Sequence, residues 1–221
     1  MTIERKFAEK LRPGFAGKLN ILMASMTGPA SSPAFYEKAL RKLHQVVTFG
    51  PYRDRAFWAE QAASLKEHAF YREGAYEYWL DIMGRLAKPC DLVTEKGLVN
   101  MAELKKKLPQ DFRPDLFLWV DQHGWNLPVN LESLNCPTVA LLGDTHLHLR
   151  NNRELWLSYA RTFDFVFLTF NRHHMKDFRE GGCPRVFWSP AACDPEVHCK
   201  IPAEKIYQVS FVGSTYAGLH Q

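Results

Sequence analysis

The chain has 221 residues and a mass of 25.5 kDa, which suits one large domain or one domain with a short piece of a second. Hydrophobic residues make up 46% and charged residues 24%, which excludes a disordered, collagen-like, coiled-coil or disulfide-dense chain. The net charge is only +4, and its densest basic run is residues 105–107. We therefore expect no nucleic-acid partner, while a weak association with membrane surfaces stays open.

The cysteines and the apolar runs indicate where the protein resides. The five cysteines are odd in number and contain no CxxC pair, so we expect reduced thiols and neither disulfides nor a thiolate zinc site. The longest early apolar run, residues 19–26, is too short for a membrane span, and the residues before it lack a signal-peptide core. These features predict a cytoplasmic protein.

The first half of the chain predicts a strand–helix–strand unit followed by a helical insertion. Residues 19–25 form an apolar run typical of a buried strand, and Ser32 with Pro33 predicts the start of a helix. A second strand is expected at residues 45–49, where Gly50 and Pro51 end it. Helical spacing of apolar residues then predicts a helical insertion near residues 55–108.

In the second half, buried strands alternate with helices. Asn152 and Asn171 are expected to cap the two helices. Strands are expected at residues 115–120, 138–142, 163–170, 185–188 and 207–212. This alternation predicts an α/β fold, a Rossmann-like three-layer domain with a mostly parallel sheet.

Polar residues follow several of the expected strands. In an open parallel sheet the ligand crevice lies beyond the carboxyl ends of the strands, so we expect these residues to converge on one edge and to serve substrate binding or catalysis. They are Ser25 with Gly28, Asp121 with His123, Asp144 with Thr145 and His146, and Asn171.

The segment Asp144-Thr145-His146-Leu147-His148 resembles the first metal motif of amidohydrolase-type hydrolases, in which two imidazoles two residues apart hold a divalent metal. Too few residues follow it for the barrel of that class, and the Gly-Asn-His of metallophosphoesterases is absent. We therefore expect no metal site, and a metal-dependent hydrolase stays an alternative. Glycine-rich dinucleotide, Walker and nucleophile-elbow motifs are absent from the sequence.

The stretch from Asp164 to Ser214 contains a strand, a helix ending in Gly-Gly, a short strand, a Pro-Ala-x-x-Asp-Pro turn at residues 190–195 and a strand ending in Phe-Val-Gly-Ser. This order resembles the middle of GT-B-fold glycosyltransferases, especially the spore-maturation CgeB-like group. The resemblance covers about residues 110–214 and, loosely, residues 36–47. Residues 43–46 depart from it because the family has a glycine-containing turn there, and Gln208 departs because the family often has Asp.

The resemblance implies the N-terminal, acceptor-side half of a glycosyltransferase. Residues 1–205 would form this domain, and residues 206–221 the linker and the first strand of a truncated second domain, with Gly213 and Ser214 at the cleft. The partners implied are a nucleotide-sugar donor, held mainly by a C-terminal donor-binding domain missing here, and a glycan, protein or cell-envelope acceptor. The family needs no essential metal or other cofactor, and the chain alone is expected to be inactive.

An inverting transfer needs a base near the acceptor hydroxyl, and the candidates are Asp121, Asp144 and His146. For both aspartates, a turn or N-cap role remains an equal alternative. Asp194 is interpreted as part of the interdomain linker in preference to a direct substrate contact. A non-catalytic α/β module that binds a ligand or partner is the remaining alternative.

Overall fold

The computed structural model describes residues 17–25, 31–52, 54, 56–57, 59–60, 81–82, 84–120, 126–183, 185–190, 192–196 and 199. The chain divides into two compact units, Met1–Ala191 and Ala192–Gln221. The helices and strands below all belong to the first unit. The predicted strand at 207–212 and the middle of the predicted helical insertion lie outside the described residues.

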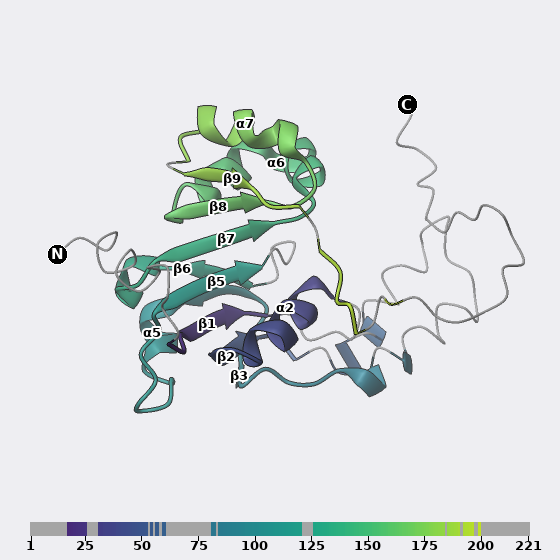
Figure 1. Ribbon diagram of the computed structural model, residues 1–221, viewed down its shortest axis with the longest axis vertical. Coiled ribbons are helices and arrows are strands. Elements are labelled where there is room, and N and C mark those ends of the chain that lie inside the picture. Colours follow the sequence, from purple (N-terminus) through teal and green to yellow (C-terminus); the bar gives the residue numbers. More distant parts are fainter. Residues whose placement is uncertain are drawn as a thin grey trace, which may run out of the picture. The chain divides into compact units, whose positions relative to one another are not determined.

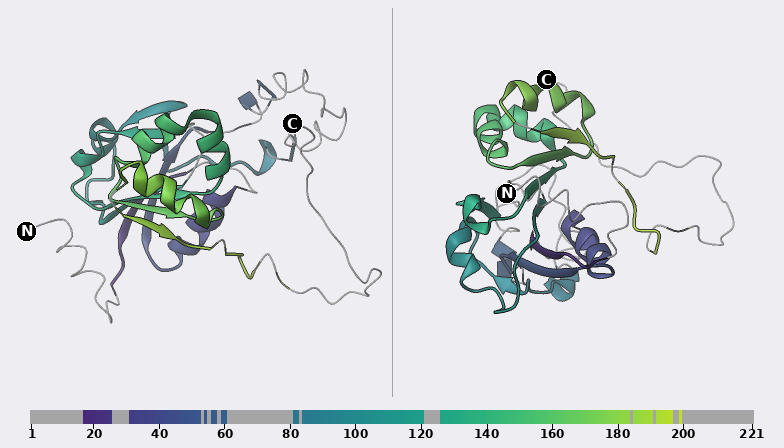
Figure 2. Two further views of the ribbon diagram at one scale, coloured as in Figure 1. Left: turned by 90° about the horizontal axis from the view of Figure 1, so that it is seen from above. Right: turned by 60° about the vertical axis from the view of Figure 1, so that its left-hand side comes forward.

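The first unit is built on a seven-stranded sheet in which every pair of neighbouring strands is parallel. Its strands, in spatial order, are β3 (Leu92–Val93), β2 (Gln45–Gly50), β1 (Asn20–Ala24), β5 (Leu116–Val120), β7 (Thr138–Leu142), β8 (Phe165–Leu168) and β9 (Val186–Trp188). Figure 1 shows this order, and in the right view of Figure 2 the purple and blue strands lie at one end and the green strands at the other.

Helices cover the two faces of this sheet and give it three layers. On one face, Tyr36 and Leu40 of α2 (Ser32–Arg41) pack against Ile21 and Met23, and Figure 1 shows α2 in front of β1 and β2. On the other face lie α6 (Thr145–Ala160) and α7 (Met175–Glu180). The expected α/β Rossmann-like fold is thereby confirmed. Among the described helices, none is long and apolar enough to cross a membrane.

The strand order defines where the sheet changes direction. The chain builds outwards from β1 through β2 to β3, then returns to the other side of β1 and continues through β5 to β9. This is the doubly wound order, with one strand added at the edge. The switch point between the two directions lies between the carboxyl ends of β1 and β5, the place where folds of this class bind ligands.

Short elements between the main strands differ from the expectation. A small parallel sheet pairs β4 (Gly97–Asn100) with β6 (Asn126–Val129), and β3 joins the edge of the main sheet. Asn100 caps the short helix α5 (Met101–Lys105), and the 3-10 turns η1 (Leu131–Leu134) and η2 (Arg172–His174) precede β7 and α7. Helix α5 lies within the predicted helical insertion, whereas the short strands β3, β4 and β6 were not predicted, because strands of two to four residues carry almost no periodicity.

Helix α6 begins seven residues before the expected cap. It starts at Thr145, and the backbone at Asn152 is non-helical. The Asn152 side chain accepts a hydrogen bond from the Leu155 backbone N–H at 3.1 Å. Asn152 therefore caps the second half of a kinked helix, so its predicted cap role is correct and its predicted place at the start of the helix is wrong.

An aspartate clamp recurs at the start of three strands. An aspartate directly precedes each of these strands, and its carboxylate accepts a hydrogen bond from a backbone N–H of the neighbouring strand. This N–H belongs to the residue just before the first one that pairs with the clamped strand. At two clamps a threonine hydroxyl also donates to the carboxylate and accepts from the aspartate N–H. The pairs are Asp91 with Thr48, Asp115 with Asn20, and Asp164 with Thr138. Each clamp fixes the register of its strand pair.

Candidate functional site

The carboxyl edge of the sheet brings three of the predicted site residues together. Asp144 and His146 follow β7, and Asn171 follows β8, the neighbouring parallel strand. Ser25, which follows β1, and Thr145, which follows β7, were predicted on the same edge and are found there. The remaining predicted residues of this edge, Gly28, Asp121 and His123, lie outside the described residues, as do Gly213 and Ser214.

Thr145 is the centre of a hydrogen-bond network between the ends of β7 and β8. Its side chain is fully buried. The Asn171 Nδ2 amide donates to Thr145 Oγ1 at 3.2 Å and lies 3.4 Å from His146 Nδ1. Thr145 Oγ1 also lies 2.8 Å from His174 Nδ1. We call these four residues the Thr145 network.

The network determines where the two imidazoles carry their protons. Asn171 uses its two amide protons on Thr145 and His146, so His146 Nδ1 is an acceptor. The Thr145 hydroxyl proton is then directed to His174 Nδ1, the acceptor that the described residues offer it. Both rings therefore carry a proton on Nε2, and their outward nitrogens are donors.

His174 is held in its neutral form. Burial lowers the pKa of His174 below its ordinary value of 6.5, and the nearby rings of His173 and His146 act in the same direction. Asp177 opposes this shift, but its carboxylate binds Arg153 at 2.8 Å. Protonation at Nδ1 would also place a second proton against the Thr145 hydroxyl. The network and the local charges therefore agree on a neutral imidazole.

Asp144 occupies the N-cap position of α6, but its side chain makes no cap hydrogen bond. The side chain is partly exposed. In this structure the carboxylate therefore does not hold the helix N-terminus, which was one of its two predicted roles. Asp144 directly precedes Thr145 in the chain and so brings a carboxylate to the carboxyl end of β7.

The geometry around residue 144 does not favour the metal-dependent hydrolase. Two ligands at i and i+2 share a side on a strand, whereas positions two apart on a helix do not face each other. Residues 145–150 are helical. Within the part of the chain that the structure describes, no group of three His, Cys, Asp or Glu residues is placed to hold a metal ion.

A second cluster of polar groups lies where β1 and β2 end, next to the switch point. The Ser25 N–H donates to the Phe49 carbonyl at 2.9 Å, and the Asn126 Nδ2 amide donates to the same oxygen at 3.1 Å. A Cβ added to Gly50 would overlap the Ser25 carbonyl oxygen, so only glycine fits there. Thr94 joins this cluster by donating its N–H to the Gly50 carbonyl at 3.0 Å.

This switch-point cluster of Ser25, Gly50, Thr94 and Asn126 contains unsatisfied polar atoms. Ser25 Oγ, Thr94 Oγ1 and Asn126 Oδ1 are buried and have no hydrogen-bond partner among the described residues. Native proteins contain few such atoms, because each costs about 1–3 kcal/mol. Hydroxyl groups and an amide oxygen without a partner match a small, neutral, hydrogen-bonding guest such as water or a sugar hydroxyl.

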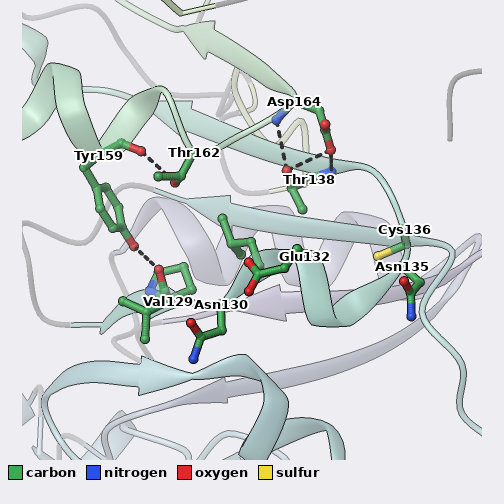
Figure 3. Close-up of a pocket in the computed structure, with 11 residues that line it drawn as sticks. Val129, Asn130, Glu132, Asn135, Cys136, Thr138, Tyr159, Thr162 and Asp164 are labelled. Atoms are coloured by element: carbon green, nitrogen blue, oxygen red, sulfur yellow. Dashed lines mark hydrogen bonds between the residues drawn. The ribbon is translucent and has the colours of Figure 1, made fainter.

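A cavity of about 350 Å³ lies at the opposite, amino edge of the sheet (Figure 3). Two of its polar side chains have partners within the protein: the Tyr159 hydroxyl donates to the Pro128 carbonyl at 3.0 Å, and Asp164 is clamped to Thr138. Burial raises the pKa of the Cys136 thiol at its wall to about 12, which leaves it unreactive near neutral pH. None of the site residues expected from the sequence lines this cavity.

Asp194 belongs to the second unit. Its carboxylate accepts a hydrogen bond from the Glu196 backbone N–H at 2.9 Å, two residues ahead. This is the local turn that an aspartate before proline favours. This contact is local, so the predicted roles of Asp194 in the linker and in substrate binding stay predictions.

Two parts of the site were not predicted from the sequence. His174 is not among the residues expected from the sequence, yet it is half-buried and bonded to Thr145. The three-residue spacing from Asn171 to His174, which brings both side chains to the same turn, was the available signal. Asn126 gave a second signal, as a polar residue in an otherwise apolar short strand.

Comparison with known proteins gives no relatives. No protein-family model, no curated protein and no solved structure matches this chain.

Proposed function

We propose that this chain is the acceptor-side domain of a glycosyltransferase, which transfers a sugar from a nucleotide-sugar donor to a glycan, protein or cell-envelope acceptor. The observation that carries the proposal is the gathering of Asp144, His146 and Asn171 at the ends of neighbouring parallel strands. The doubly wound sheet and the resemblance of residues 110–214 to GT-B-fold enzymes support it.

In the proposed reaction Asp144 is the base. Its carboxylate accepts the proton of the acceptor hydroxyl, whose oxygen attacks the anomeric carbon, while the bond from that carbon to the diphosphate oxygen breaks and the nucleoside diphosphate leaves with the electron pair. His146 is less suited to this role, because Asn171 binds Nδ1 and leaves the proton on Nε2. His146 instead donates a hydrogen bond to the substrate, and Asn171 positions its ring.

The test uses the full-length gene product and a panel of nucleotide sugars, with release of the nucleoside diphosphate as the readout. Asp144→Asn is expected to lower kcat by roughly 10²–10⁴-fold, the usual contribution of a general base. Asp111→Asn, which changes an exposed aspartate between α5 and β5, is the matched control and should keep wild-type kcat. No turnover with any donor, or full activity of Asp144→Asn, would contradict the proposal.

A further inference from the structure

The outward nitrogens of the Thr145 network form a group of hydrogen-bond donors for which the described part of the chain offers no acceptor. His146 and His174 accept at Nδ1, so each presents an N–H at Nε2. Among the described residues neither Nε2 has a hydrogen-bond partner. Structural histidines at such positions generally bind a carboxylate or a carbonyl with the second nitrogen. These two are available for a ligand.

The surroundings of these donors are basic. Arg172 and His173 precede His174 in the same 3-10 turn, and the His173 and His174 rings are 4.1 Å apart. The Arg172 guanidinium stacks over the Trp188 ring at 5.3 Å and makes no ion pair with a described residue. Asp177, the carboxylate that acts on His174, is bound to Arg153. The turn therefore carries positive charge that no ion pair with a described residue neutralises.

These groups are accessible as well as basic. His146, Arg172 and His173 are exposed, and His174 and Asn171 are half-buried. A ligand reaches them without any change in the described structure. Their anchor is rigid by contrast, because Thr145 is fully buried and bonds to both Asn171 and His174. Fixed donors around an open surface are the arrangement of a binding site.

We propose that His146, His174 and Arg172 form a binding site for a phosphate-type oxyanion at the carboxyl ends of β7 and β8. The site presents donors, namely two imidazole N–H groups and a guanidinium, which matches the acceptor oxygens of a phosphate. Arg172 supplies the permanent charge, and its planar fork suits a phosphate group. The Thr145 network supplies the orientation of both rings.

The anion site goes beyond the proposed function, because the attack of an acceptor hydroxyl does not require it. It shares His146 with the proposed transfer reaction, but phosphate binding is measured without a sugar donor. Two ligands would bring this chemistry to the site: the diphosphate of a nucleotide sugar, or a phosphate carried by the acceptor. UDP and a sugar phosphate represent these two sources.

The test is a titration of the full chain with inorganic phosphate, followed by NMR of the imidazole nitrogens and by calorimetry. Saturable shifts of the His146 and His174 Nε2 signals are expected. The bound anion should also raise the pKa of His174, because it opposes the effects of His173, His146 and Arg153. Competition by UDP and by glucose 1-phosphate then identifies the source, since the natural ligand displaces phosphate at the lower concentration.

Two variants separate the site from general anion attraction. Arg172→Gln is expected to weaken phosphate binding about tenfold, the effect of one charge-assisted hydrogen bond. His44→Gln, which changes a histidine before β2 whose Nδ1 accepts from the Leu19 N–H, should bind as the wild type does. Unmoved His146 and His174 signals in the wild-type chain, or equal weakening by both variants, would overturn the proposal.

Discussion

At the scale of single residues, the placement of protons decides what the carboxyl edge can do. Had Asn171 presented its amide oxygen to His146, the outward nitrogen of that ring would be a base. The amide nitrogen faces it instead, and the ring becomes a donor. Asp144, which directly precedes Thr145, supplies a carboxylate at the end of β7, which is why the proposed chemistry assigns the proton transfer to it.

Gly50 is a residue whose replacement has a predictable cost. A methyl group at this position overlaps the backbone carbonyl of Ser25, which cannot move without breaking its strand. Gly50→Ala should destabilise the protein by about 3 kcal/mol, measured as the free energy of unfolding in urea. Gly143→Ala is the matched control, because its Cβ would meet the Phe170 ring at 3.4 Å, an ordinary contact. Equal losses for the two variants would contradict this explanation.

Sequence reasoning predicted the site only in part. Asp144, His146 and Asn171 were found because the ends of parallel strands share an edge, whichever residues precede them. The link from Thr145 to His174 was not, because it depends on a buried hydroxyl whose partner lies 29 residues away. The unpaired atoms of Ser25 and Asn126 also required coordinates, since burial of a polar atom is a property of its neighbours.

At the scale of elements, the three aspartate clamps give a structural explanation for Asp164, one residue of the stretch that resembles glycosyltransferases. Asp164 begins the stretch, residues 164–214, whose order of elements resembles the glycosyltransferases. The same residue type stands before β3 and β5 and makes the same contact with the preceding strand. Asp164 therefore has a structural role in the sheet, and its presence is weaker evidence for a glycosyltransferase than the resemblance implies.

The clamp between Asp164 and Thr138 has a measurable energy. Asp164→Ala leaves the N–H and hydroxyl of the buried Thr138 without their acceptor, at a cost of about 2 kcal/mol. Combined with Thr138→Val, the loss should be smaller than the sum of the single losses by about 1 kcal/mol, because both variants remove the same contact. Chemical denaturation of the four proteins measures this coupling, and strict additivity would show that no clamp exists.

The main strands were predicted because fully buried parallel strands are uninterrupted apolar runs. Residues 115–120 and 138–142 matched β5 and β7 within one residue. The start of α6 was missed because Thr145 to Arg150 carries no clear apolar stripe, whereas the cap at Asn152 is a local signal that the kinked helix retains. Strand β6 was not predicted because it contains Pro128, and proline argues against a central strand. In the structure β6 belongs to a two-stranded sheet, where proline is tolerated.

At the scale of the whole molecule, stability should decline in acid in two stages. The pKa of His174 lies below 6.5, so the unfolded chain binds a proton before the folded one, and stability falls as the pH drops below 6.5. Partial burial acts to raise the pKa of Asp91, but hydrogen bonds from Thr48 and Arg41 hold it below 3.8. The stabilisation that Asp91 provides is therefore complete above pH 3.8 and is lost as the pH falls further.

Urea midpoints measured from pH 8 to pH 3 test this dependence. His174→Gln keeps an acceptor for the Thr145 hydroxyl but does not titrate, so it should remove part of the decline between pH 6.5 and pH 5. The decline near pH 3 should persist in that variant, because Asp91 is unchanged. A variant curve that parallels the wild type from pH 6.5 to pH 5 would contradict the role given to His174.

Thiol chemistry provides an independent test of the whole fold. All five cysteines are free; Cys193 and Cys199 are exposed, and the others are buried. Burial raises the pKa of Cys90 and Cys136 to about 12 and that of Cys183 to about 11. Ellman's reagent should therefore react quickly with two thiols in the native protein and with five in urea. Rapid reaction of a third native thiol would contradict the packing described.

The aspartate clamps also have a consequence for the time scale on which the sheet opens. Each clamp ties an amide proton on one strand to the residue that starts its neighbour, so this proton exchanges with solvent only when the two strands separate. Thr48 and Thr138 report on β2–β3 and on β7–β8, one pair on either side of the switch point. Their deuterium uptake rates would therefore reveal whether the two halves of the doubly wound sheet open together or one at a time.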